Sequence, residues 1–131
     1  MRGITIHGNT AKISEVSLPT VKPTYLLAKV EAVALNPTDW KYIKFGLAVP
    51  GALSGCDFAG TVIEVGTDVN KAVKPGDRIA GVVHGGNSPN ACFAEYVIAK
   101  ADLVIKLPDS LAFKKASTLL LSLATMGQGL Y

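Results

Sequence analysis

The chain has 131 residues, of which 49% are hydrophobic and 18% charged. This length suits one average domain, and the apolar fraction can fill a buried core, which excludes a disordered charged tail. The net charge of +3 is scattered without a basic stripe, so nothing favours nucleic-acid binding. No apolar run is long enough for a membrane span and the start lacks a signal-peptide core. We therefore expect a cytoplasmic protein with no membrane attachment.

Short strands are expected over most of the chain. Alternating apolar and polar residues, punctuated by Gly and Pro, predict strands at 2–7, 10–16, 25–35, 57–65, 79–84, 92–99 and 103–107. Pro75-Gly76 predicts a tight turn, because Pro presets φ at the second turn position and Gly tolerates positive φ at the third. The strands show no internal repeat, and residues 1–108 therefore indicate one mainly β barrel or sandwich.

One internal helix is expected after the third strand. Asn36 is a good N-cap, and Pro37 fits the first helical position because the N–H that proline lacks would have no partner there. The helix should run over 37–45 and end before Gly46, which suits the left-handed position after a helix.

The pattern becomes helical only after Pro108. We predict a helix over 113–123 and a second one that starts near Ser122 or Thr125 and runs to the last residue. Residues 109–131 therefore form a second segment, the start of a helical connection to another unit.

The first turn of that segment is poorly suited to begin a helix. Ala112 is a weak cap, and Lys114 and Lys115 place two cations near a helix N-terminus, each unfavourable by ~0.3–1 kcal/mol. We predict that this turn is frayed or is capped earlier by Ser110.

Single residues with catalytic potential are weak indicators. The two cysteines, Cys56 and Cys92, lack metal-site spacing and are expected to be reduced thiols. His84 precedes Gly85-Gly86, where a ligand could approach the backbone closely, but a structural role is the preferred interpretation of this histidine. Gly127-Gln128-Gly129 does not follow a strand, so it is not the start of a dinucleotide-binding loop.

The combination of motifs is more specific. In order they are VALNPTDWK at 33–41, GCDFAGTV at 55–62, VG at 65–66, VKPGDRI at 73–79, FAEYV at 93–97, KLPD at 106–109 and the segment 116–131. Together they cover nearly the whole chain and resemble the medium-chain dehydrogenase/reductase superfamily in its zinc-free branch. Within it, residues 36–41, 55–60 and 124–131 are most similar to fungal trans-acting enoyl reductases; quinone oxidoreductases share much of the pattern.

The resemblance implies a GroES-like, partly open barrel, followed by a Rossmann domain that is missing from these 131 residues and would hold most of the NADPH. The implied reaction is hydride transfer from NADPH to an α,β-unsaturated polyketide thioester carried by the acyl carrier protein of a synthase. On this view the chain alone is inactive. The alternatives are a quinone oxidoreductase-like protein and a free-standing, non-catalytic GroES-like binding module.

No metal site is expected. Zinc-dependent members of the superfamily carry a cysteine at the position of Asn36 and a His-Glu pair at Cys56-Asp57, and they hold a structural zinc with four cysteines. A catalytic zinc needs three protein ligands and a structural zinc needs four, which two cysteines cannot supply. Asp57 is instead expected to order its loop by accepting backbone hydrogen bonds.

The resemblance also assigns site residues. It implies that NADPH is contacted by Thr38, Asp39, Trp40, Lys41 and Thr125. It implies that the substrate is contacted by Met126, Gly127, Gln128, Gly129, Leu130 and Tyr131. The open alternatives are a helix cap with a core tryptophan for the first group and ordinary helix packing for the second.

Two further expectations concern the same segments. The proton donor stays open between Tyr131, Lys41 and solvent. The leucines of the C-terminal segment form an apolar patch, which predicts self-association or partner binding through the terminal helix.

Overall fold

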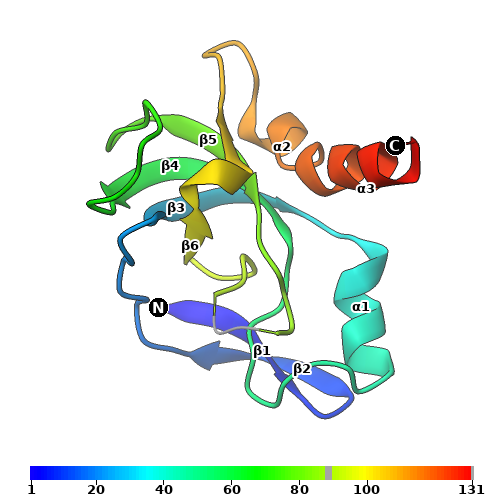
Figure 1. Cartoon of the computed structure of the whole chain (residues 1–131). Coiled ribbons are helices and arrows are strands. Elements are labelled where there is room, and N and C mark those ends of the chain that lie inside the picture. Colours follow the sequence, from blue (N-terminus) through cyan, green and yellow to red (C-terminus); the bar gives the residue numbers. More distant parts are fainter. Residues whose placement is uncertain (88–89, 131) are drawn as a thin grey trace.

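The computed structural model describes residues 1–87 and 90–130. Strands predominate, with one α-helix and one 3-10 turn between them, and two helices end the described chain (Figure 1). The elements are β1 (Arg2–His7), β2 (Thr10–Glu15), β3 (Tyr25–Ala34), α1 (Pro37–Lys44), β4 (Asp57–Val65), β5 (Arg78–Val82), β6 (Tyr96–Lys100), the 3-10 turn η1 (Ala101–Leu103), β7 (Val104–Lys106), α2 (Phe113–Ala116) and α3 (Leu120–Leu130).

Five strands form one antiparallel sheet in the order β6-β3-β4-β5-β7. The two edge strands, β6 and β7, follow each other in the chain, so η1 links the edges covalently where no ladder of hydrogen bonds joins them. The Lys71 ammonium reinforces this corner by donating to the carbonyl oxygens of Ala101 and Val104. The predicted mainly β, partly open barrel with a C-terminal helical segment is confirmed.

The sheet can curl because β3 and β4 are locally irregular. Their register shifts between Leu27 and Ala28 and again between Val30 and Ala32, and such bulges increase strand twist. Gly60 of β4 lies so close to β3 that a Cβ there would stand 2.1 Å from the Lys29 carbonyl oxygen.

The β1–β2 hairpin lies beside the barrel and is joined to it by the segment that precedes β6. The Ile4 N–H donates to the Phe93 carbonyl at 2.8 Å, and the Glu95 N–H donates to the Arg2 carbonyl at 3.1 Å. The predicted strand 92–99 is therefore wrong in its first four residues: these run along β1, and β6 begins only at Tyr96, where pairing with β3 starts.

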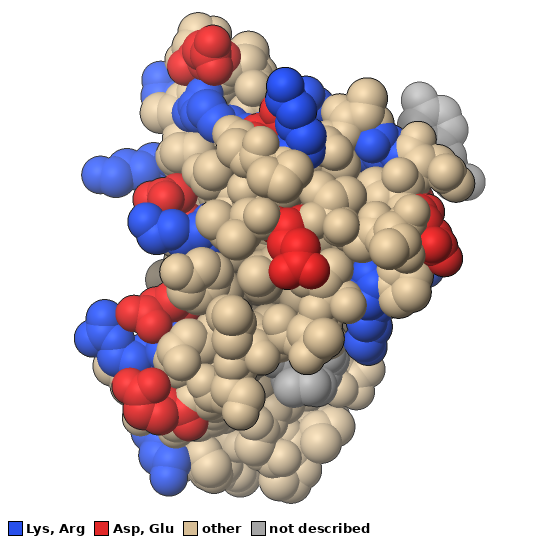
Figure 2. Space-filling model, turned by 90° about the vertical axis from the view of Figure 1, so that its left-hand side faces the viewer, with Lys and Arg blue, Asp and Glu red and all other residues tan. Residues whose placement is uncertain are grey.

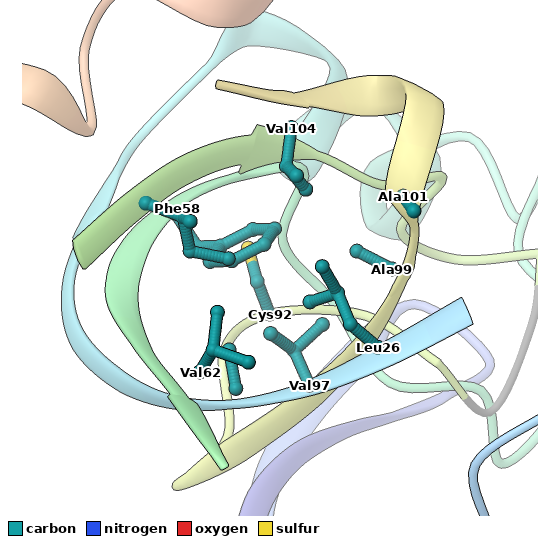
Figure 3. Close-up of a cluster of buried hydrophobic side chains, with 10 residues drawn as sticks. Leu26, Phe58, Val62, Cys92, Val97, Ala99, Ala101 and Val104 are labelled. Atoms are coloured by element: carbon teal, nitrogen blue, oxygen red, sulfur yellow. The ribbon is translucent and has the colours of Figure 1, made fainter. Parts of the chain in front are cut away.

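The core fills the inside of the curled sheet (Figure 3). It contains ten buried residues contributed by every strand of the sheet, by η1 and by the segment before β6. Phe58 from β4 lies at its centre with no exposed surface. Burying an aromatic or branched side chain contributes roughly 1.5–3 kcal/mol each. The members are Leu26, Ala28, Phe58, Val62, Ile79, Cys92, Val97, Ala99, Ala101 and Val104.

The C-terminal helices differ from the prediction in their boundaries. The expected single helix over 113–123 is wrong: α2 ends at Ala116, and α3 begins at Leu120, earlier than either expected start. One cause of the break is local. The Ser117 hydroxyl donates to the Lys114 carbonyl at 3.2 Å and the Thr118 hydroxyl to the Lys115 carbonyl at 2.9 Å, so side chains compete with backbone N–H groups for these acceptors.

Helix α2 begins without a side-chain cap. Its N-cap is Ala112, so the expected cap by Ser110 is wrong. The preceding turn is held by Arg78, whose guanidinium donates to the Pro108 carbonyl at 2.8 Å and the Leu111 carbonyl at 2.7 Å. The same guanidinium lies 4.4 Å from the centre of the Phe113 ring, which ties the short helix to β5.

The surface shows no single-sign patch on the face in Figure 2, where basic and acidic side chains are interspersed. Among the described residues, no helix has the length and apolarity that crossing a bilayer requires.

Candidate functional site

A cleft of about 800 Å³ opens beside the barrel. Figure 1 places α1 and α3 on the same side of the molecule, and the cleft is lined by the start of α1, the end of β5 and the first turns of α3. Its apolar lining includes Val82, Val83, Leu103, Leu121 and Met126. Its polar lining consists of Asn36, Thr38, Cys56, His84, Ser122 and Thr125. A mostly apolar hollow with a few polar groups is typical of small-molecule sites.

The start of α1 is fixed by two buried carboxylates. The Asp39 carboxylate accepts a hydrogen bond from the backbone N–H of Asn36 at 2.7 Å. This bond ties the first turn of α1 to its N-cap residue. The Asn36 side-chain amide donates instead to the Asp57 carboxylate at 3.1 Å. Asn36 therefore joins α1 to the first residue of β4, and its amide is already engaged.

Asp57 also anchors the opposite wall. Its other carboxylate oxygen accepts the Leu121 N–H of α3 at 2.9 Å, and the residue is only 1% exposed. A helix N-terminus has free N–H groups and a positive dipole end, so a carboxylate there is favourable. Asp57 does accept a backbone hydrogen bond, but the donor belongs to α3; the expectation that the residue orders its own loop is corrected accordingly.

Burial determines the ionisation of the groups below the cleft. It raises the pKa of Asp39 and of Asp57, and the hydrogen bonds from Asn36 and Leu121 only partly oppose this effect. Burial also raises the pKa of Cys56 to about 11, with the Asp39 carboxylate adding to the shift. Cys56 is therefore a neutral thiol at physiological pH and a poor nucleophile.

The predicted cofactor residues divide into two groups. Thr38 and Thr125 line the cleft from α1 and α3, respectively. Asp39 is buried in the cap of α1. Trp40 is half exposed outside the cleft lining, with the Lys41 ammonium 5.8 Å from its ring centre.

The predicted substrate residues divide similarly. Met126 lines the cleft, and Gln128, Gly129 and Leu130 are exposed farther along α3, outside the lining. Gly127 is partly buried and also lies outside the lining. Tyr131 lies outside the described residues.

Sequence reasoning missed much of the apolar wall. Val82 and Val83 are separated from Leu103 in sequence by β6 and the segment before it, and they meet only when β5 and η1 fold together. Leu121 and Ser122 join them because Asp57 draws the start of α3 to the barrel. One sequence signal pointed to this wall, namely the strand that ends just before Gly85-Gly86. It placed His84 where a ligand could approach.

Metal ligands are not brought together in the part of the chain that the structure describes. Among those residues no group of three or more His, Cys, Asp and Glu side chains has an arrangement that could hold an ion. Both cysteines are buried and free.

Solved structures share this fold. A quinone oxidoreductase from Coxiella burnetii matches 99% of this chain with 44% of its own, at 32% identity and a TM-score of 0.86. The quinone oxidoreductase of Escherichia coli, solved in complex with NADPH, matches 99% of this chain with 40% of its own, at 25% identity and a TM-score of 0.81.

Curated relatives are more similar in sequence. A trans-enoyl reductase of Aspergillus sclerotiorum is 50% identical over 97% of this chain, and one of Alternaria alternata is 46% identical over 92%. The chain spans only 36% of the length of each. The family model described as the alcohol dehydrogenase GroES-like domain matches residues 22–109. This chain belongs to the alcohol dehydrogenase GroES-like domain family, within the medium-chain dehydrogenase/reductase superfamily.

Proposed function

We propose that this chain is the substrate-side part of an NADPH-dependent enoyl reductase that works without zinc. The observation that carries the proposal is the 50% identity to a trans-enoyl reductase across 97% of the chain. The substrate would be an α,β-unsaturated polyketide thioester, presented by the acyl carrier protein of a synthase. Residues 1–108 would form the catalytic barrel, and residues 109–131 would begin the connection to a nucleotide-binding domain.

The cleft fits one end of the cofactor. Its apolar walls at Val83, Leu121 and Met126 suit a flat nicotinamide ring, and the hydroxyls of Thr38 and Thr125 can meet polar edges of it. When bound, the dihydronicotinamide supplies the hydride. No lysine or arginine is among the residues found to line the cleft, so the phosphates would be held elsewhere.

The remaining assigned residues would act at the edges of this cleft. Asp39 would hold the first turn of α1 in place, and Trp40 and Lys41 would meet the cofactor beyond the cleft mouth. Gly127, Gln128, Gly129, Leu130 and Tyr131 would extend the substrate path along α3.

Binding at the cleft can be tested on this chain with backbone amide NMR and two probes. Titration with S-crotonyl-N-acetylcysteamine, an enoyl thioester, should shift the amides of Thr38, Leu121 and Thr125 saturably. Titration with menadione, a quinone, should shift them less. Met126→Lys, which places a charge on the apolar wall, should abolish the response. Leu123→Lys, at a half-exposed site of the same helix outside the lining, should leave it unchanged.

Each outcome of that titration separates the candidate functions. A saturable response to menadione alone would favour the quinone oxidoreductase function, which the Coxiella burnetii and Escherichia coli structures support. No response to either probe would contradict the reductase and favour a non-catalytic binding module.

Cofactor binding gives a second test. Because the cleft offers no cation for the phosphates, we expect the isolated chain to bind NADPH more weakly than micromolar and to be inactive alone. Calorimetry with NADPH measures this directly. Micromolar or tighter binding would contradict the proposal that the NADPH site is divided between this chain and a nucleotide-binding domain.

The exposed apolar side chains of α3 give a third test. Leu123, Met126 and Leu130 are more than half exposed, and no residue of α3 is buried. We propose that the chain self-associates through this helix, because exposed apolar patches favour association. Light scattering should show mass increasing with concentration, and a monomer at all concentrations would contradict this.

A further inference from the structure

His84 is the ionisable side chain of the cleft that the function above leaves unused. The residue follows β5, its side chain is exposed, and it lines the cleft together with Val82 and Val83. Imidazole is the side chain whose ordinary pKa lies nearest to neutrality, so it can both hold and release a proton under physiological conditions.

The other polar groups of the cleft cannot do this. The raised pKa of Cys56, about 11, keeps its thiol proton in place. The Asn36 amide is bonded to Asp57. Ser and Thr hydroxyls do not ionise near neutral pH. Among the residues found to line the cleft, His84 alone carries an imidazole, whose ring nitrogens can donate or accept a proton, and its side chain is exposed.

The backbone around His84 is held rigidly. The Val83 N–H donates to the Cys56 carbonyl at 2.9 Å and the Gly86 N–H donates to the Leu53 carbonyl at 2.8 Å, so bonds flank the histidine on both sides. Gly85 packs so tightly that a Cβ there would lie 2.7 Å from the backbone nitrogen of Gly55. The segment has little freedom to move away from the cleft.

The imidazole ring is positioned by an aromatic neighbour. The Tyr42 ring of α1 meets it edge to face, with ring centres 5.8 Å apart and planes at 70°. Such a contact orients a ring without occupying its nitrogen atoms. Tyr42 therefore orients the imidazole, and no hydrogen bond to the ring nitrogens of His84 is found among the described residues.

We propose that His84 is the proton donor of the cleft, giving its imidazolium proton to the substrate after hydride addition. The inference rests on the proposed enoyl reductase function. A bound dihydronicotinamide would supply the hydride for the new C–H bond at the β-carbon and would be left as the oxidised nicotinamide. The π electrons of the C=C bond would move toward the thioester carbonyl to give an enolate. The imidazolium N–H bond then breaks, its electron pair stays on nitrogen, and the proton forms the C–H bond at the α-carbon. Solvent water returns a proton to the neutral imidazole.

The chain is suited to a direct test because it contains only two histidines. His7 is the matched control, since it lies in β1 and its Nε2 faces the Thr5 hydroxyl at 3.0 Å. The ring nitrogens of both residues can be followed by ¹⁵N NMR in the chain labelled at histidine. The probes are S-crotonyl-N-acetylcysteamine, and S-acetoacetyl-N-acetylcysteamine, whose enolate resembles the species that accepts the proton.

We expect both probes to shift the His84 ring nitrogens along the same saturation curve as the Thr125 amide, and to leave His7 unmoved. The acetoacetyl probe should move the His84 nitrogens toward imidazolium positions. His84→Phe, which keeps an aromatic ring against Tyr42, should weaken acetoacetyl binding at least about tenfold. His84→Gln, which retains an N–H donor, should weaken it less, and His7→Gln should have no effect.

Two other results would overturn the inference and differ in what they imply. If the Thr125 amide shifts while the His84 nitrogens do not, His84 is not the donor, and the proposed enoyl reductase function stands. If neither moves up to about 10 mM probe, both the donor role and the proposed function fail.

Discussion

The barrel core and helix α3 are both rich in apolar residues, yet they use them differently. Phe58, Leu26 and Ile79 have no exposed surface. Helix α3 contains no charged residue, yet none of its residues is buried. The barrel surrounds its apolar side chains with a curled sheet. Only the start of α3 meets that sheet, through the Asp57–Leu121 hydrogen bond and the packing of Leu120 on a small buried cluster that includes Ala59 and Ala80. The contrast shows that apolar composition predicts a preference for burial, and that topology decides whether neighbours exist to provide it.

The largest expected effect compares how tightly side chains are packed in the barrel core and on α3. Phe58→Ala should lower the free energy of unfolding by about 3–5 kcal/mol, because it opens a cavity in the barrel core. Leu130→Ala, at a site that is 70% exposed, should change it by less than about 0.5 kcal/mol. Urea unfolding of both variants measures the difference. Equal costs would mean that α3 is packed as tightly as the barrel.

The next effect tests the attachment of α3. Asp57→Ala leaves the Leu121 N–H and the Asn36 amide without their acceptor, and should cost about 1–3 kcal/mol. Amide hydrogen exchange at Leu121 should become faster while β3 stays protected. Asp57→Asn, which keeps one acceptor oxygen, should cost less. Unchanged exchange at Leu121 would show that α3 is held by its packing instead.

A pH effect should follow from the other buried carboxyl. Because burial raises the pKa of Asp39 in the folded state, the folded chain binds more protons than the unfolded chain above the ordinary aspartate pKa. The stabilising contribution of Asp39 is therefore full at low pH and is lost as pH rises through its raised pKa.

The neutral variant Asp39→Asn isolates that contribution from those of the exposed carboxyls. The unfolding free energy of the unmodified chain, minus that of Asp39→Asn, should fall as pH rises from acid toward neutral. Urea unfolding at a series of pH values gives this difference. A difference that is flat with pH, or that rises, would contradict a raised pKa.

The smallest effect concerns the intrinsic stability of α3. A Cβ at Gly127 would have open space around it, and glycine inside a helix is less stable than alanine by about 0.5–1 kcal/mol. Gly127→Ala should therefore raise helicity by circular dichroism and slow amide exchange in α3. Ala124→Gly, at an exposed site of the same helix, should do the reverse. A loss of helicity in Gly127→Ala would mean that this position is packed.

Local patterns predicted elements well where the structure depends on neighbours in sequence. The strand at 57–65 agrees with β4, and the helix after Asn36 begins at Pro37 and is followed by Gly46 with a φ of +62°. Gly76 likewise has the positive φ that the Pro75-Gly76 turn requires. These features depend on φ preferences and capping, which act within a few residues.

Local patterns failed where distant segments compete. Residues 92–95 have a strand-like pattern, but β1 takes their hydrogen bonds and only the following residues pair with β3. The helix expected over 113–123 breaks because Ser117 and Thr118 bond to the preceding turn and Asp57 captures Leu121. The second cause joins residues 64 positions apart, which no local window contains.

The amino-acid sequence alone determined that the chain is a mainly β protein with a helical end, and its ordered motifs indicated the dehydrogenase/reductase superfamily. Alternation, turns and caps are encoded locally, so they can be read without a structure. The tertiary structure alone decided that Asp39 faces inward, that Trp40 lies outside the cleft, and that His84 lines the cleft beside Tyr42 of α1. The spacing of residues along a strand or helix determines which face of that element each one lies on. What that face then contacts depends on how the sheet curls and on where Asp57 anchors the last helix.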